Sequence, residues 1–190
     1  MDAVVTDPPW NRGKDYGTTD DARAEDAYLP WLAEVLRHCV RVSRGPVAVF
    51  LGRENGERLP TLLRRSTARP SPRCLARLHW QRSPGVLEDV AVLAGSSAGG
   101  LRRDLLCRAE VALADSPEPA ETFGHPCPKP VAAVQGLLAV VLPTGGTVLD
   151  PFMGVGSTLL AARHLGCPAI GMELEERFCS SALHRLTGAP

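Results

Sequence analysis

The sequence has no excess of charge of either sign, no long apolar run and no closely spaced cysteines. Its 21 basic and 21 acidic residues give a formal net charge of zero, so no global basic field marks the chain as a nucleic-acid binder. No uninterrupted apolar run reaches the roughly 18 residues of a membrane-spanning helix, and no charged-then-apolar leader opens the chain. The six cysteines form no CxxC pair, and their spacing fits neither a zinc site nor a disulfide framework. We therefore expect a cytoplasmic protein that binds no metal and no membrane.

The order of the apolar segments predicts one α/β domain. The chain has 190 residues, of which 44% are hydrophobic, enough to bury a core. Apolar residues recur at helical spacing over 27–42, and short apolar runs at 3–6 and 47–51 indicate buried strands. Further strands are expected at 75–80, 90–93, 147–149 and 169–172, and further helices around 59–63 and at 131–142, 157–165 and 175–186. Strands that alternate with helices predict a mostly parallel sheet covered on both faces.

The most informative segment, residues 148–158, has the sequence VLDPFMGVGST. A buried strand ends at Asp150, a tight turn carries Gly154 and Gly156, and a helix follows. Glycine lets a ligand approach the backbone, and the N-terminus of a helix offers unpaired N–H groups to a carboxylate. About twenty residues later, at the end of the next strand, Glu173 can accept hydrogen bonds from both hydroxyls of a ribose.

A second segment, DPPW at residues 7–10, follows the first expected strand. Open α/β sheets bind ligands at this edge, and consecutive prolines stiffen the turn there. The Asp7 carboxylate and the Pro8 carbonyl can each accept one N–H of an exocyclic amino group, while Trp10 stacks on the base. The alternative is a rigid turn with a surface tryptophan and no ligand.

A third segment, HPCPKP at residues 125–130, comes just before an expected helix. A proline-locked turn can form one wall of a pocket, and Lys129 can meet an anionic group there. Taken alone, such a segment is more often a loop than a site.

Basic residues also gather between Arg53 and Arg82, with Arg64, Arg65 and Arg69 at the centre of the run. These three side chains are candidates for phosphate contacts. A solvated arginine-rich face explains them equally well, since charge runs alone are weak evidence.

Together and in this order, the three segments resemble the amino-methyltransferases of bacterial and phage DNA, in the class whose catalytic half precedes its cofactor half. In that family DPPW or DPPY is the catalytic motif, HPxxKP opens the cofactor half, and DPFxGxGST with a later acidic residue holds S-adenosylmethionine. The resemblance is sharpest at residues 1–10 and 125–186. It implies a Rossmann-like S-adenosylmethionine-dependent methyltransferase fold with circularly permuted motif order. The single domain, 1–190, would comprise a catalytic half (1–94), a short variable recognition excursion (95–124) and a cofactor-binding half (125–190).

The resemblance also implies an activity, the site-specific transfer of a methyl group from S-adenosylmethionine to the N6 amino group of adenine in DNA. The catalytic residues that it implies are Asp7, Pro8, Pro9 and Trp10. The cofactor-binding residues that it implies are Asp150, Phe152, Gly154, Gly156, Ser157, Thr158, Glu173 and Lys129, the last on the side of the cofactor's carboxylate. In this family an aspartate that opens the first motif favours adenine. Cytosine N4 stays open because its amino chemistry is nearly the same, and RNA stays open because DPPW also occurs in RNA adenine methyltransferases.

Two departures from the family pattern add further expectations. Relatives usually carry a strand and a helix before the catalytic strand, so we expect a cofactor site that is open on one side. Three explanations stay open: the given start is too late, another chain fills the gap, or the cofactor binds weakly. The excursion is short for a target-recognition domain, which predicts a short recognition site, weak selectivity or help from a partner. Besides DNA, the expected partner is therefore a second copy in a homodimer or a partner subunit. The alternative functions are a non-catalytic subunit that keeps the fold and, less compatible with DPPW, a nicotinamide-dependent oxidoreductase.

Overall fold

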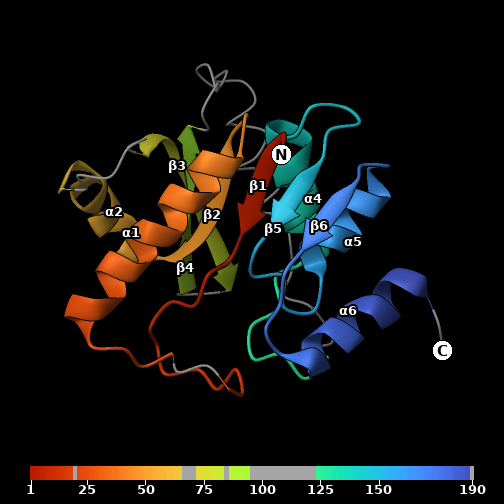
Figure 1. Cartoon of the computed structure of the whole chain (residues 1–190), viewed down its shortest axis with the longest axis horizontal. Helices are drawn as coiled ribbons and strands as arrows, with labels where there is room; N and C mark the ends of the chain where they lie inside the picture. The colour runs from red at the N-terminus through yellow and green to blue at the C-terminus, as the bar shows by residue number, and fades with distance from the viewer. Residues whose placement is uncertain (19–20, 66–71, 84–85, 95–122, 189–190) are drawn as a thin grey trace.

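The computed structural model describes residues 1–18, 21–65, 72–83, 86–94 and 123–188, which form a six-stranded sheet flanked by helices (Figure 1). The strands are β1 (Ala3–Thr6), β2 (Val47–Gly52), β3 (Arg73–Ser83), β4 (Val86–Ala94), β5 (Val148–Asp150) and β6 (Ala169–Gly171). The helices are α1 (Glu25–Val42), α2 (Arg53–Arg65), α4 (Val131–Val141), α5 (Ser157–His164) and α6 (Glu176–Thr187). The predicted α/β architecture is confirmed.

The strand order is β3-β4-β2-β1-β5-β6. Strands β2, β1, β5 and β6 are parallel to one another, while β4 runs antiparallel to β2 and pairs with β3 in an antiparallel hairpin. The sheet is therefore mostly parallel, as predicted. The carboxyl ends of β1 and β5, which carry the two main motifs, lie next to each other at one edge.

Two apolar layers, one on each face of the sheet, form the core. The helix α1 has an amphipathic pattern, and its apolar stripe, which includes Leu32 and Leu36, packs on Val4, Val47 and Val49. Successive side chains of a strand point to opposite faces, so the alternate positions of β1 and β2 pack with α4 and α5 on the other face. Figure 1 shows α1 in front of the sheet and α4 behind it. Both layers hold the carboxyl ends of the parallel strands in fixed positions.

Some sequence-based expectations fall outside what the structure describes. Most of the excursion at 95–124 and Arg69 lie outside the described residues, as do the side chains of Arg64 and Arg65 at the end of α2. Among the helices that are described, none combines the length and the apolar character that crossing a membrane requires.

Candidate active site

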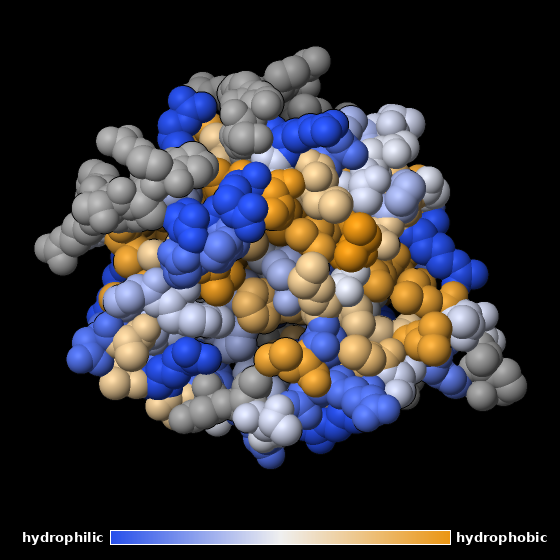
Figure 2. Space-filling view, viewed as in Figure 1, coloured by the Kyte–Doolittle hydropathy of each residue, from blue (hydrophilic) through white to orange (hydrophobic). Residues whose placement is uncertain are grey.

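The carboxyl ends of β1 and β5 bring the DPPW segment beside the glycine-rich turn. Val4 pairs with Leu149 across the two strands, and the Thr6 hydroxyl donates a 2.8 Å hydrogen bond to Asp150 Oδ1. Residues of both segments line one cavity of about 410 Å³. Figure 2 shows this face of the molecule, hollowed between the chain that follows β1 and the chain that leads into α6.

Asp150 is a buried acid at the base of this cavity. Its Oδ1 accepts hydrogen bonds from the Thr6 hydroxyl at 2.8 Å and from the Phe152 N–H at 3.0 Å. Burial raises the pKa of Asp150 to about 6, although hydrogen bonds from Thr158, Phe152 and Thr6 act in the opposite direction. Asp150 therefore changes its charge near neutral pH, unlike an ordinary exposed aspartate.

The glycine-rich turn has the backbone shape that the sequence predicts. Gly154 and Gly156 have φ values of 50° and 80°, a region that side chains with a Cβ avoid. A Cβ on Gly154 would lie 3.0 Å from His125 Nε2, and one on Gly156 would lie 2.9 Å from the Ala182 Cβ of α6. Ser157 then opens α5, whose first two residues line the cavity.

Glu173 follows β6 and faces the glycine-rich turn. One carboxylate oxygen accepts the Gly154 N–H at 2.9 Å, and the other accepts the N–H groups of Leu174 and Glu175 at 2.8 and 3.0 Å. The exposed side chains of Met172 and Leu174 line the cavity on either side of it. The acid thus stands beside the turn as predicted, and the two flanking apolar residues were not predicted.

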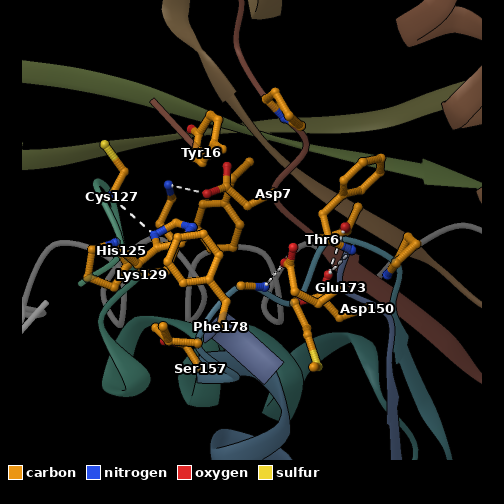
Figure 3. Close-up of a pocket in the computed structure, with 18 of the residues that line it drawn as sticks. Thr6, Asp7, Tyr16, His125, Cys127, Lys129, Asp150, Ser157, Glu173 and Phe178 are labelled. Carbon is orange, nitrogen blue, oxygen red and sulfur yellow. Dashed lines mark hydrogen bonds and ion pairs between the residues drawn. The ribbon is translucent and has the colours of Figure 1, made fainter. Parts of the chain in front are cut away.

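In the DPPW segment, the Asp7 carboxylate contacts Lys129 and Trp10. Lys129 Nζ lies 2.6 Å from Asp7 Oδ2 (Figure 3), and the Trp10 indole N–H donates to Asp7 Oδ1 at 2.9 Å. Tyr28 donates its hydroxyl hydrogen to the Pro9 carbonyl at 3.0 Å, and Asn55 donates to the Trp10 carbonyl at 3.2 Å. These bonds to side chains of α1 and α2 fix the turn that carries the carboxylate.

Of the residues predicted for the catalytic motif and the cofactor, Pro8, Trp10 and Gly156 do not line the main cavity, whereas Lys129 does. Trp10 does not line the main cavity but a second one, of about 100 Å³, that adjoins it at Asn11 and Tyr28. The Lys129 ammonium lies 4.6 Å from the centre of the Trp10 ring, and the Arg12 guanidinium lies 5.6 Å from it. Lys129, expected beside the cofactor's carboxylate, therefore lies at the DPPW turn in this structure.

The HPCPKP segment forms part of the cavity wall, as the sequence suggests, and Tyr16 and Phe178, which were not predicted, complete it. The His125 ring packs 4.7 Å from the Phe178 ring of α6 and 5.6 Å from the Tyr16 ring. Burial lowers the pKa of His125 to about 4, so this imidazole is neutral at pH 7, and its Nδ1 accepts the Cys127 N–H at 3.2 Å. Burial also raises the pKa of Tyr16. The only sequence evidence for this wall is the HPxxKP motif that contains His125.

The segment between β1 and α1 is organised by a single buried acid. Asp21 accepts hydrogen bonds from the backbone N–H groups of Asn11, Arg12 and Lys14, at 2.7 to 3.1 Å. A second tie joins Thr18 to Glu175 at the start of α6. The segment therefore spans from the DPPW turn to the start of α6, and Tyr16 lines the cavity.

The chain's match to a known protein family agrees with this geometry. Residues 1–66 and 109–184 match the sequence model of the N6/N4 DNA methylase family. The chain therefore belongs to this family of DNA methyltransferases, which depend on S-adenosylmethionine and modify adenine N6 or cytosine N4. The resemblance predicted from the motifs is confirmed.

Individual relatives and structures are similar along nearly the whole chain. The type II methyltransferase M.HpaI of Haemophilus parainfluenzae is 26% identical over 217 residues, which cover 98% of this chain and 68% of that relative. The DNA adenine methyltransferase YhdJ of Escherichia coli (strain K12) is 24% identical over 233 residues, covering 98% and 76%. The crystal structure of the M1.HpyAVI–SAM complex superposes with a TM-score of 0.67 at 21% identity, covering 97% of this chain and 88% of that one. The superposition confirms the predicted fold class.

Proposed function

We propose that this chain methylates the N6 amino group of adenine in DNA, at the DPPW turn. The observation that supports this proposal is that the Asp7 carboxylate and the glycine-rich turn share one cavity at the ends of adjacent parallel strands. Two further points favour adenine over cytosine: the family resemblance links an aspartate at the first motif position to adenine, and the relative YhdJ is named for adenine.

The residues around the glycine-rich turn fit S-adenosylmethionine. A cavity of about 410 Å³ lies within the range of small-molecule sites. Glu173 would hold the ribose hydroxyls, and the methionine part would lie along the turn, where Asp150 can meet its ammonium group and the N–H groups of α5 can meet its carboxylate. The remaining residues proposed to hold the cofactor are Phe152, Gly154, Gly156, Ser157 and Thr158. When bound, this cofactor supplies an electrophilic methyl group on a positively charged sulfur.

The DPPW turn prepares the nucleophile. The lone pair of an exocyclic amino group is delocalised into the ring, which makes the nitrogen a poor nucleophile. If Asp7 and the Pro8 carbonyl each accept one of its N–H groups, the nitrogen becomes more tetrahedral and its lone pair is restored. Pro9 keeps the turn rigid, so the acceptors are in place before the base arrives. The amino nitrogen would gain a positive charge as the methyl carbon leaves the cofactor's sulfur and bonds to it, and it would then lose a proton to water.

Trp10 and Lys129 act on Asp7 in this mechanism. Their hydrogen bonds hold the carboxylate in one orientation before the base arrives. A base that stacks on the Trp10 ring would take the place of one of the two cations now beside it. In duplex DNA, the target base would first have to leave the stack.

The test is an assay that identifies the methylated base. Purified protein is incubated with radiolabelled methyl donor and unmethylated duplex DNA, the DNA is digested to nucleosides, and the product is identified by mass spectrometry. We expect N6-methyladenine with the wild type and none with Asp7→Ala, while Asp7→Ala still binds the cofactor in calorimetry. N4-methylcytosine would overturn the choice of base, and product formed only on RNA would overturn the choice of nucleic acid. Cofactor binding without product on any substrate would favour the non-catalytic alternative.

A further inference from the structure

Glu88 is a buried carboxylate beneath the catalytic motif that belongs to none of the three sequence motifs. It lies on β4, where it pairs in register with Gly52 of β2 and Trp80 of β3, and it is 3% exposed. Its Oε2 lies 3.9 Å from Lys129 Nζ. The neighbouring residue Asp89 contacts Arg77 and His79 instead.

Lys129 lies between two carboxylates. Its side chain is 5% exposed, and its ammonium is 2.6 Å from Asp7 and 3.9 Å from Glu88. Among the described residues, these are the two acids within 4 Å of it. A buried ammonium needs such partners, because removing a charge from water costs several kcal/mol.

The position of the ammonium bears on the reaction. Methyl transfer moves a positive charge from the sulfur to the amino nitrogen, so negative charge close to that nitrogen favours the transition state. With the Lys129 ammonium 2.6 Å from Asp7 Oδ2, the attraction that Asp7 offers to this charge is weakened. A shift of the ammonium away from Asp7 and toward Glu88 would restore it.

We propose that Glu88 is a positioning residue that takes over the Lys129 ammonium when the target amino group binds to Asp7. This inference rests on the proposed function. Lysine has a flexible stem and three rotatable donors, and a movement of about 1 Å brings Nζ within charge-assisted hydrogen-bond distance of Glu88. Asp7 Oδ2 accepts a hydrogen bond from Lys129 in this structure, and it then accepts one from the amino N–H instead.

The first test compares Glu88→Gln with Asp89→Asn, a matched control that removes the adjacent buried carboxylate from the same strand. All rates are divided by the concentration of protein that binds S-adenosylmethionine, so partial unfolding does not enter. We expect Glu88→Gln to lower kcat about 10-fold to 100-fold, the effect of losing one hydrogen bond to a charged group, with an unchanged Kd for the cofactor. Asp89→Asn should keep the wild-type kcat, and Glu88→Asp should recover part of the loss.

The second test asks whether Glu88 acts through Lys129. In Glu88→Gln the ammonium keeps Asp7 as its carboxylate partner, so adding Lys129→Met should cause no further loss of kcat and should raise it. A merely structural role predicts that the two losses multiply. Multiplying losses, or equal kcat values for Glu88→Gln and Asp89→Asn, would overturn the inference while wild-type methylation of DNA still stands. Absence of wild-type methylation would instead count against the proposed function itself.

Discussion

Lowering the pH from 7 to 5 is expected to weaken cofactor binding about tenfold, because Asp150 loses its charge over that range. Burial raises the pKa of Asp150 to about 6. About nine in ten of these carboxyls are then ionised at pH 7 and about one in ten at pH 5. If the ionised form holds the ammonium group of the cofactor, the apparent Kd rises in proportion as the carboxylate is protonated.

The same shift acts on stability in the opposite direction. The folded-state pKa of Asp150 lies above its ordinary value of 3.8, so ionisation opposes folding. The contribution of Asp150 to the free energy of unfolding is fully present below pH 3.8 and is lost as the pH rises through about 6. The total loss is about 3 kcal/mol. In the absence of cofactor, the wild type should therefore lose about 2 kcal/mol between pH 4 and pH 7 relative to Asp150→Asn.

Calorimetric titration with S-adenosylmethionine at pH 5, 6 and 7 measures the first effect, and urea unfolding of both proteins measures the second. Folded His125 stays mostly neutral from pH 5 to 7, since burial lowers its pKa to about 4, and its effect on unfolding is the same in both proteins. Asp150→Asn should bind weakly and without dependence on pH. A wild-type Kd that stays constant from pH 5 to 7, or a variant with the same pH dependence, would refute the assignment of Asp150 to the cofactor's ammonium.

Two further predictions concern the motifs themselves. Trp10→Phe keeps an aromatic ring but removes the indole donor to Asp7. We expect kcat to fall about 10-fold and the Kd for the cofactor to stay unchanged. Equal changes in kcat and in the cofactor Kd would show that Trp10 only stabilises the fold. Gly156→Ala combines a φ of 80° with a Cβ 2.9 Å from that of Ala182, and urea unfolding should show a loss of about 3 kcal/mol. Gly166→Ala is its control, since Gly166 also has a positive φ but an added Cβ would meet nothing within 4 Å; equal losses in the two variants would contradict the steric argument.

The elements that the sequence predicts well are those whose residues are buried on a regular period. The run Ala3–Thr6 forms β1 with the predicted bounds, and α1 begins at Glu25, two positions before the predicted start. The apolar spacing indicates helix α2 only near Leu59, but the helix begins at Arg53 directly after β2. Its first two turns are mostly polar, so no apolar period marks them.

The same contrast holds for the site. The DPPW and glycine-rich segments are local in sequence, so the sequence alone is enough to name their residues. Glu88, Asp21 and Tyr28 could not be named in this way, because each acts through contacts with residues elsewhere in the chain. A glutamate within a strand has the pattern of a solvent-facing residue, and only the pairing of β4 with β2 places it beneath Lys129.

The hydrogen bond between Thr6 and Asp150 joins positions 144 residues apart, and this separation has a consequence for folding. Contacts between distant segments form late, because the entropy of closing the intervening loop opposes them. Neither half of the chain can therefore offer a finished cofactor site while β1 and β5 are apart. During refolding, affinity for S-adenosylmethionine should return no earlier than the pairing of these two strands, so the cofactor serves as a probe of the completed fold.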